Sequence, residues 1–146
     1  MQRVYTFMER VHPLPVLLVL GFLAALAWTQ WPAWWWFEVA KVQVANARYT
    51  MEIPMEVDRV IRRPFQGAWL VTVRRWTDKG WEAHCNAAGT SNYRPDAQLP
   101  EKLTLLWWTD GVCNTMPVGK YVVDTSWRIN SAQIVRNSSN IFEVTP

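Results

Sequence analysis

The pattern of apolar and polar positions changes once along the chain, near residue 38. Residues 11–37 contain no Lys, Arg, Asp or Glu, and their apolar run LPVLLVLGFLAALA begins at Leu14. A helix over residues 14–37 would rise about 36 Å, and the hydrocarbon core of a bilayer is roughly 30 Å thick. The pattern therefore predicts one N-terminal transmembrane α-helix over residues 14–37, preceded by a short cytoplasmic N-terminus of residues 1–13.

Tryptophans crowd the second half of this uncharged stretch. They are Trp28, Trp31, Trp34, Trp35 and Trp36. Indole is well accommodated at a membrane boundary, where its ring lies in the apolar edge and its N–H points toward the headgroups. We expect these five side chains to lie at the membrane interface and the lipid bilayer to be a partner of the chain.

A cleaved signal peptide is the alternative interpretation of the same residues. Arg3 and Arg10 precede the apolar run, and residues 25–27 (Ala-Leu-Ala) fit the small residues before a signal peptidase site. Cleavage after Ala27 would leave a chain beginning WTQWPAWWWF, an apolar patch that soluble domains rarely expose. We favour an uncleaved anchor in the cytoplasmic (inner) membrane or in a virion membrane, with the N-terminus inside.

From residue 38 onward the apolar period is two, which is typical of strands. Strand-like segments separated by turns cover residues 49–58, 68–76, 81–86, 103–109, 120–129 and 133–144. A polar, proline-containing stretch over residues 87–100 predicts a loop. The expected fold is all-β, an antiparallel β-sandwich over residues 48–146, with a linker or first strand over residues 38–47.

One segment near the C-terminus resembles part of a known fold. The sequence Pro117-Val-Gly119-Lys-Tyr121 resembles the entry to the penultimate strand of immunoglobulin-like and fibronectin-type sandwiches, where Gly-x-Tyr forms the tyrosine corner. The resemblance implies an immunoglobulin-like sandwich, with a generic β-barrel as the second choice. Val123 stands where immunoglobulin domains have a cysteine. Trp69 or Trp81 is the expected core tryptophan.

The two cysteines, Cys85 and Cys113, both lie in the β-rich region. An even cysteine count in a small exported domain predicts one structural disulfide. In a reducing compartment the same pair would be buried thiols. A disulfide agrees with an extracytoplasmic position of the sandwich.

Residues with catalytic or metal-binding chemistry are sparse. His12 and His84 belong to no spacing typical of metal ligands, and no serine has a histidine or acid at a nucleophile spacing. The formal net charge of +3 is too small to indicate a nucleic-acid surface. We expect no catalytic residue, no metal or other cofactor, and no nucleic-acid partner.

Three pairs of neighbouring residues are candidate contacts with a partner. They are Trp107 and Trp108, Tyr93 and Arg94, and Arg62 and Arg63. Adjacent residues of a strand point to opposite faces, so one tryptophan of the first pair should be exposed. Aromatic and arginine side chains are enriched among the residues that dominate interfaces, and arginines also contact headgroups or acidic partners.

These features predict a single-pass, membrane-anchored, non-catalytic interaction module. Its extracytoplasmic sandwich would bind a protein partner in an envelope complex or in a virus or phage assembly, or would form a homo-oligomer. The alternative is an exported, soluble binding or enzyme-accessory domain in which residues 87–100 hold a small ligand.

Overall fold

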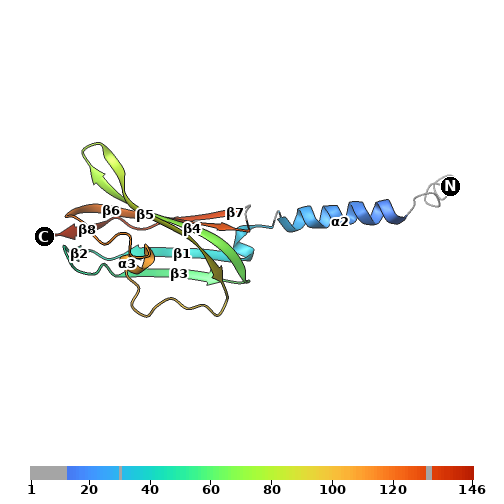
Figure 1. Cartoon of the computed structure of the whole chain (residues 1–146), viewed down its shortest axis with the longest axis horizontal. Helices are drawn as coiled ribbons and strands as arrows, with labels where there is room; N and C mark the ends of the chain where they lie inside the picture. Colours follow the sequence, from blue (N-terminus) through green and yellow to red (C-terminus); the bar gives the residue numbers. More distant parts are fainter. Residues whose placement is uncertain (1–12, 30, 131–132) are drawn as a thin grey trace. The chain divides into compact units, whose positions relative to one another are not determined.

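The structure is a computed structural model that describes residues 13–29, 31–130 and 133–146 (Figure 1). The chain divides into two compact units, Met1–Pro32 and Ala33–Pro146. Most of the predicted N-terminal segment, residues 1–12, lies outside the described residues.

The first unit contains helix α2 (Pro13–Thr29). Two prolines lie in its first turn, where a missing backbone N–H has no helical partner to lose. Apolar side chains cover every side of the helix and are exposed. Within the part of the chain that the structure describes, no helix has the length and hydropathy needed to cross a membrane.

The predicted extent of this helix, residues 14–37, is wrong at its C-terminal end. The helix ends at Thr29, and the second unit begins with a short 3-10 helix, η1 (Ala33–Trp35), and strand β1 (Phe37–Val44). Pro32 disfavours helical geometry in the residue before it. Trp36 and Phe37 are only 6% and 1% exposed, because they pack in the β core instead of continuing a helix.

The smaller of the two sheets consists of β1 and β3 (Met55–Ile61), which pair antiparallel with Phe37 opposite Ile61. The strand predicted over residues 49–58 therefore begins later than expected. Thr50 has a positive φ of 73°, which breaks an extended strand, and Pro54 forms an isolated bridge with Thr104.

The larger sheet contains the remaining six strands. They are β2 (Ala47–Arg48), β4 (Phe65–Thr77), β5 (Gly80–Tyr93), β6 (Gly119–Ile129), β7 (Gln133–Ser138) and β8 (Phe142–Thr145). The strand order is β2-β8-β6-β4-β5, and β7 pairs with β6 beside β8. All of these pairs are antiparallel except β2 with β8.

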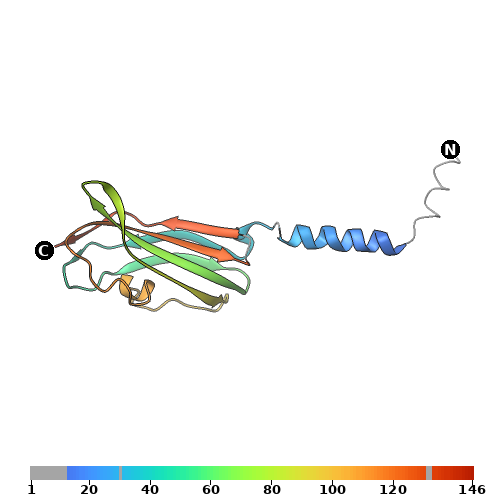
Figure 2. The same cartoon turned by 45° about the horizontal axis from the view of Figure 1, so that its top comes forward.

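Strands β4 and β5 form the long hairpin that the sequence predicts, and its turn extends past the paired part of β6 (Figure 2). Gly80 supplies the positive φ of 109° that this turn needs. Residues 87–93 belong to β5, so the loop predicted over residues 87–100 is wrong in its first half. The residues in this part of β5 have small or polar side chains, and they pair with β4 through backbone hydrogen bonds. A pattern of alternating apolar side chains does not reveal such pairing.

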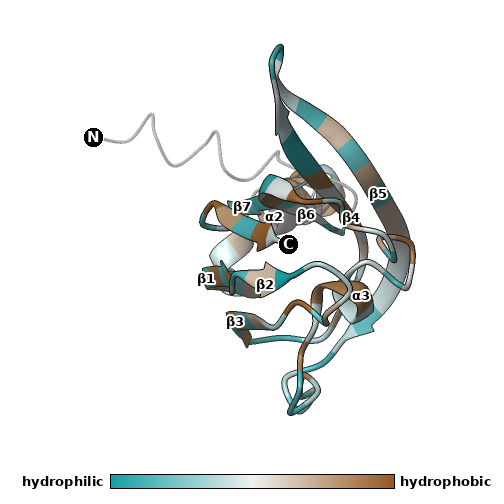
Figure 3. Cartoon of the chain, turned by 90° about the vertical axis from the view of Figure 1, so that its left-hand side faces the viewer, coloured by the Kyte–Doolittle hydropathy of each residue, from teal (hydrophilic) through white to brown (hydrophobic). Residues whose placement is uncertain are grey.

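The two sheets face each other and enclose one core (Figure 3). The Phe37 ring of β1 lies 5.1 Å from the Trp127 ring of β6 and 5.7 Å from those of Phe65 and Tyr93. Trp127 is 2% exposed and occupies the place expected for Trp69 or Trp81. The chain is predominantly β with two sheets, consistent with the predicted sandwich.

Two further contacts tie the larger sheet to its connections. The predicted disulfide is present, and joins Cys85 of β5 to Cys113 with a Cα–Cα distance of 5.8 Å. The Tyr121 hydroxyl donates to the Pro117 carbonyl at 2.5 Å, as a tyrosine corner does.

Candidate functional site, an aromatic pocket

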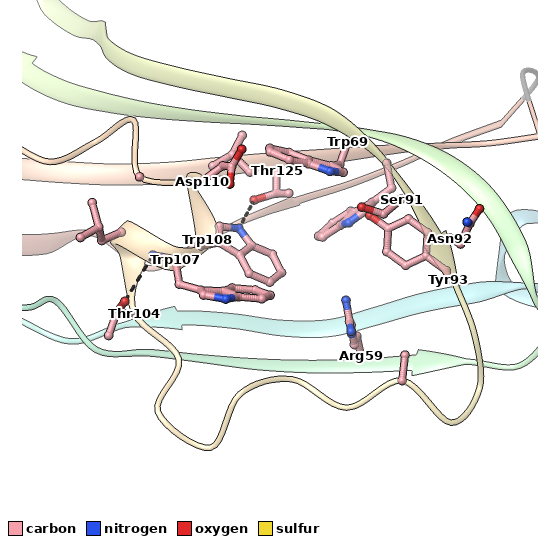
Figure 4. Close-up of a pocket in the computed structure, with 15 residues that line it drawn as sticks. Arg59, Trp69, Ser91, Asn92, Tyr93, Thr104, Trp107, Trp108, Asp110 and Thr125 are labelled. Atoms are coloured by element: carbon pink, nitrogen blue, oxygen red, sulfur yellow. Dashed lines mark hydrogen bonds between the residues drawn. The ribbon is translucent and has the colours of Figure 1, made fainter.

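An open pocket of about 610 Å³ lies in the second unit and is lined by residues of five elements (Figure 4). These elements are β3, β4, β5, β6 and helix α3 (Leu105–Trp108). Five of the residues that line it are aromatic: Trp69, Tyr93, Trp107, Trp108 and Trp127. The volume falls within the range typical of sites for small molecules, roughly 300 to 1,000 Å³.

Helix α3 forms the wall that carries Trp107 and Trp108, and the strand predicted over residues 103–109 is wrong. The Thr104 hydroxyl accepts from the Trp107 backbone N–H at the start of the helix, which is the bond expected of an N-cap. At the other end the Thr109 hydroxyl donates to the Leu105 carbonyl at 2.9 Å. Local hydrogen bonds of these threonines therefore favour a turn of helix over an extended strand.

The two adjacent tryptophans have different surroundings. Trp108 is buried, and its indole N–H donates to the Thr125 hydroxyl of β6 at 3.1 Å. Trp107 is 54% exposed and lies against the Trp108 ring at a centroid distance of 6.4 Å. Trp108 therefore fixes the wall to the core, while Trp107 is available for contact.

Tyr93 lines the pocket and is the last residue of β5. It is buried at the end of β5, and its ring stacks on that of Phe65 at 4.7 Å. Burial raises the pKa of the Tyr93 phenol, an effect that the nearby Arg59 and, to a smaller extent, Trp127 and Ser91 oppose. The loop predicted over residues 87–100 is wrong at Tyr93, because β5 continues into the core to this residue.

Trp69 owes its place in the pocket to a glycine on the neighbouring strand. It lies opposite Gly89 in the hairpin register, and a Cβ at residue 89 would come within 2.8 Å of the Trp69 ring. Glycine thus leaves space for the ring to lie close to the β5 backbone. The Trp69 ring remains partly exposed at the pocket wall.

Arg59 is one of the pocket residues that the sequence analysis did not select as a contact. It lies on β3, and its guanidinium carbon is 5.9 Å from the centre of the Tyr93 ring. Burial lowers the pKa of Arg59, an effect that the nearby Tyr93 partly opposes. A pattern could have identified it, because Arg59 occupies the row of Met55, Val57 and Ile61, where an apolar residue is expected.

The charges around the pocket are few and lie apart. Among the described residues, no carboxylate lies within ion-pair distance of Arg59. Asp110 follows α3 with a φ of 51° and is exposed. Figure 4 shows Asp110 and Arg59 on different sides of the aromatic rings. The pocket therefore offers one cation, one anion and several flat apolar faces.

The other predicted contact residues lie outside this pocket. Arg94 forms a two-bond pair with Asp96, with both distances 3.0 Å, and both side chains are exposed. Arg62 binds the Glu38 carboxylate at 2.7 Å and the Trp34 carbonyl at 2.6 Å. Arg62 thus holds η1 against the ends of β1 and β3.

The tryptophans predicted at the membrane interface do not form one group. Trp36 is buried in the β unit, and Trp35 carries Arg63 over its ring at 4.1 Å. Trp34 is exposed. Trp31 belongs to the first unit, and Trp28 lies in α2 with a side chain outside the described residues.

Three comparisons with known proteins find no match. No protein-family model matches the chain, and neither does any curated protein or solved structure. In the described residues, no group of three or more His, Cys, Asp and Glu side chains is placed to hold a metal ion. The chemistry of the pocket residues therefore bears most directly on function.

Proposed function

We propose that the chain is a membrane-anchored, non-catalytic binding module whose sandwich binds its partner in the aromatic pocket. The observation that carries this proposal is the pairing of exposed Trp107 with buried, hydrogen-bonded Trp108 beside Arg59. Tryptophan, tyrosine and arginine dominate binding energy where they lie in well-packed pockets. A rigid aromatic wall also loses little conformational entropy when a partner binds.

The proposed anchor is helix α2, in a cytoplasmic (inner) or virion membrane with the N-terminus inside. A helix that is apolar on every side is typical of a protein core or a membrane. Its 17 residues rise about 26 Å, which is near the lower limit for a membrane span. A short span is accommodated by local thinning of the bilayer.

The proposed sandwich is immunoglobulin-like and extracytoplasmic. The hydrogen bond from Tyr121 to Pro117 supports the immunoglobulin-like assignment. The disulfide between Cys85 and Cys113 supports an oxidising compartment.

The proposed partner is a protein of an envelope complex or of a virus or phage assembly, or a second copy of this chain. The pocket also supports the second candidate function, the binding of a small ligand. Ser91, Asn92 and Tyr93 line it and belong to the 87–100 segment to which the sequence assigns that role.

Capture from native membranes with paired tryptophan variants tests the proposal. Trp76 is the matched control for Trp107, because it is 53% exposed, lies beside another tryptophan and is not among the residues that line the pocket. A specific partner should be retained by wild type and Trp76→Ala and lost by Trp107→Ala. Equal retention by both variants would refute the role of the pocket, as would a turnover reaction abolished by one polar substitution.

The anchor needs a separate measurement. A reporter that is active only outside the cytoplasm, fused after Pro146, should be active, and the chain should stay in the membrane fraction after an alkaline carbonate wash. Activity of a cytoplasm-only reporter at the same position would contradict the proposed orientation. Release by the wash would contradict the anchor.

A further inference from the structure

We infer that the aromatic pocket binds an acidic saccharide, with a sugar ring packed on Trp107 or Trp69 and a carboxylate paired with Arg59. This inference rests on the second candidate function, the binding of a small ligand in the aromatic pocket, because it names the class of that ligand. Three features of the pocket carry it: the exposed ring faces, the unpaired guanidinium and the placement of the two charges.

Two of the aromatic residues that line the pocket present ring surface to a ligand, Trp107, which is 54% exposed, and the half-buried Trp69. The indole N–H of Trp108 is bonded to Thr125 within the protein, and Tyr93 and Trp127 are only 7% and 2% exposed. The face of an aromatic ring carries negative charge density, so it attracts C–H groups with partial positive charge. A pyranose presents such C–H groups on a flat face, and Trp107 and Trp69 expose rings of matching shape.

Arg59 differs from Arg62 and Arg94, two of the arginines that the sequence brings forward. Arg62 and Arg94 each bind a carboxylate within the domain, at 2.7 and 3.0 Å. The Arg59 guanidinium lies over the Tyr93 ring, with its carbon 5.9 Å from the ring centre. Burial lowers the pKa of Arg59, because water solvates the buried guanidinium poorly. A ligand carboxylate would accept two parallel hydrogen bonds from the planar guanidinium.

The placement of charge also disfavours other ligand classes. A trimethylammonium group would suit aromatic rings, but it would be repelled by the guanidinium in the same pocket. A phosphate would bring up to two negative charges toward a pocket that already contains the Asp110 carboxylate. A singly charged carboxylate fits one arginine, and Asp110 accepts hydrogen bonds from sugar hydroxyls on the other side of the rings.

Binding to a panel of acidic saccharides and their methyl esters tests the inference. The full chain is held in micelles of lauryldimethylamine oxide, because maltoside detergents would themselves present sugar rings. The panel contains oligogalacturonate, a hyaluronan fragment, sialyllactose and a muramyl disaccharide. Calorimetry and tryptophan fluorescence should detect binding of at least one acid, with its neutral methyl ester about 10-fold to 100-fold weaker, the range for a charge-assisted pair.

Two sets of variants identify the groups responsible. Arg59→Gln should bind acid and ester equally weakly, and Arg59→Lys should retain part of the preference, because lysine keeps the charge without the planar pair of donors. Trp107→Ala should lose both ligands, and Trp76→Ala should bind as wild type does. Far-ultraviolet circular dichroism confirms that each variant is folded.

The outcomes separate this inference from the proposed function. Binding of no panel member, equal affinity for acid and ester, or an unchanged preference in folded Arg59 variants would each overturn the saccharide assignment. If a protein partner is still lost by Trp107→Ala, the pocket remains a binding site and its occupant is a protein segment. If Trp107→Ala changes neither partner nor ligand binding, the proposed function fails as well.

Discussion

Reduction of the disulfide between Cys85 and Cys113 should destabilise the sandwich by about 3.6 kcal/mol. The bridge joins residues 28 apart in sequence, and the chain-entropy relation gives about 12 cal/mol/K for a loop of that length at 25 °C. It connects β5 to the segment that follows α3, so the unfolded reduced chain gains freedom that the oxidised chain lacks. The native strands themselves need not change.

Urea unfolding of the oxidised and reduced full chain in micelles measures this difference. Near-ultraviolet circular dichroism reports the aromatic core and is insensitive to the α2 backbone. With a denaturant slope of about 1 to 3 kcal/mol per molar, the midpoint should fall by roughly 1 to 4 M. The control is Cys85→Ala with Cys113→Ala, which should unfold near the reduced midpoint and should not respond to reductant.

A reduced midpoint within about 0.3 M of the oxidised one would refute the entropic reasoning, because less than about 1 kcal/mol would then depend on the bridge. Alanine is preferred to serine at residue 113 because Cys113 is buried and a hydroxyl there would need a partner.

Two further predictions concern the pocket and the core. Gly89→Ala should displace the Trp69 ring, because a Cβ at residue 89 would come within 2.8 Å of that ring. Tryptophan fluorescence should change and pocket binding should weaken, while the unfolding free energy falls by less than about 1 kcal/mol. Unchanged emission and binding would contradict this prediction. Burial raises the pKa of Tyr121 in the folded state above the unfolded pKa of about 10. The protonated phenol therefore contributes its full stability below the unfolded pKa, and this contribution is lost as pH rises through the folded pKa. Unfolding free energies from pH 9 to 11 should therefore fall less steeply in Tyr121→Phe than in wild type, and parallel curves would disprove the linkage.

Alternation and turn chemistry predicted the regular part of the fold. The hairpin of β4 and β5 follows from apolar alternation on both sides of Gly80, and β6 nearly coincides with the run predicted over residues 120–129. Each of these segments presents one apolar row to the core, so a short window of sequence contains the information. The cysteine count indicated the bridge for a similar reason, because only one pairing exists.

The tryptophan-rich segment shows where the same information fails. Trp36 and Phe37 are equally suited to a bilayer and to a protein core, since both environments accept large apolar surfaces. What decides between them is the pairing of Phe37 with Ile61 and its contact with Trp127, residues far away in sequence. Only the three-dimensional partner of β1 distinguishes the two environments.

The pocket could be predicted only in its parts, because its walls come from five separated elements. Alternation places Arg59 in an apolar row of β3, and a Thr-capped turn places Trp107 beside Trp108, but neither pattern indicates that β3 and α3 line one space. That proximity depends on Trp108 reaching Thr125 on β6 and on Arg59 lying over Tyr93 at the end of β5. A charged residue in an apolar row is therefore the sequence feature that most deserved a functional hypothesis, since placing a guanidinium there is costly unless it has a partner. No carboxylate among the described residues pairs with Arg59, and the acidic saccharide that we propose would supply one.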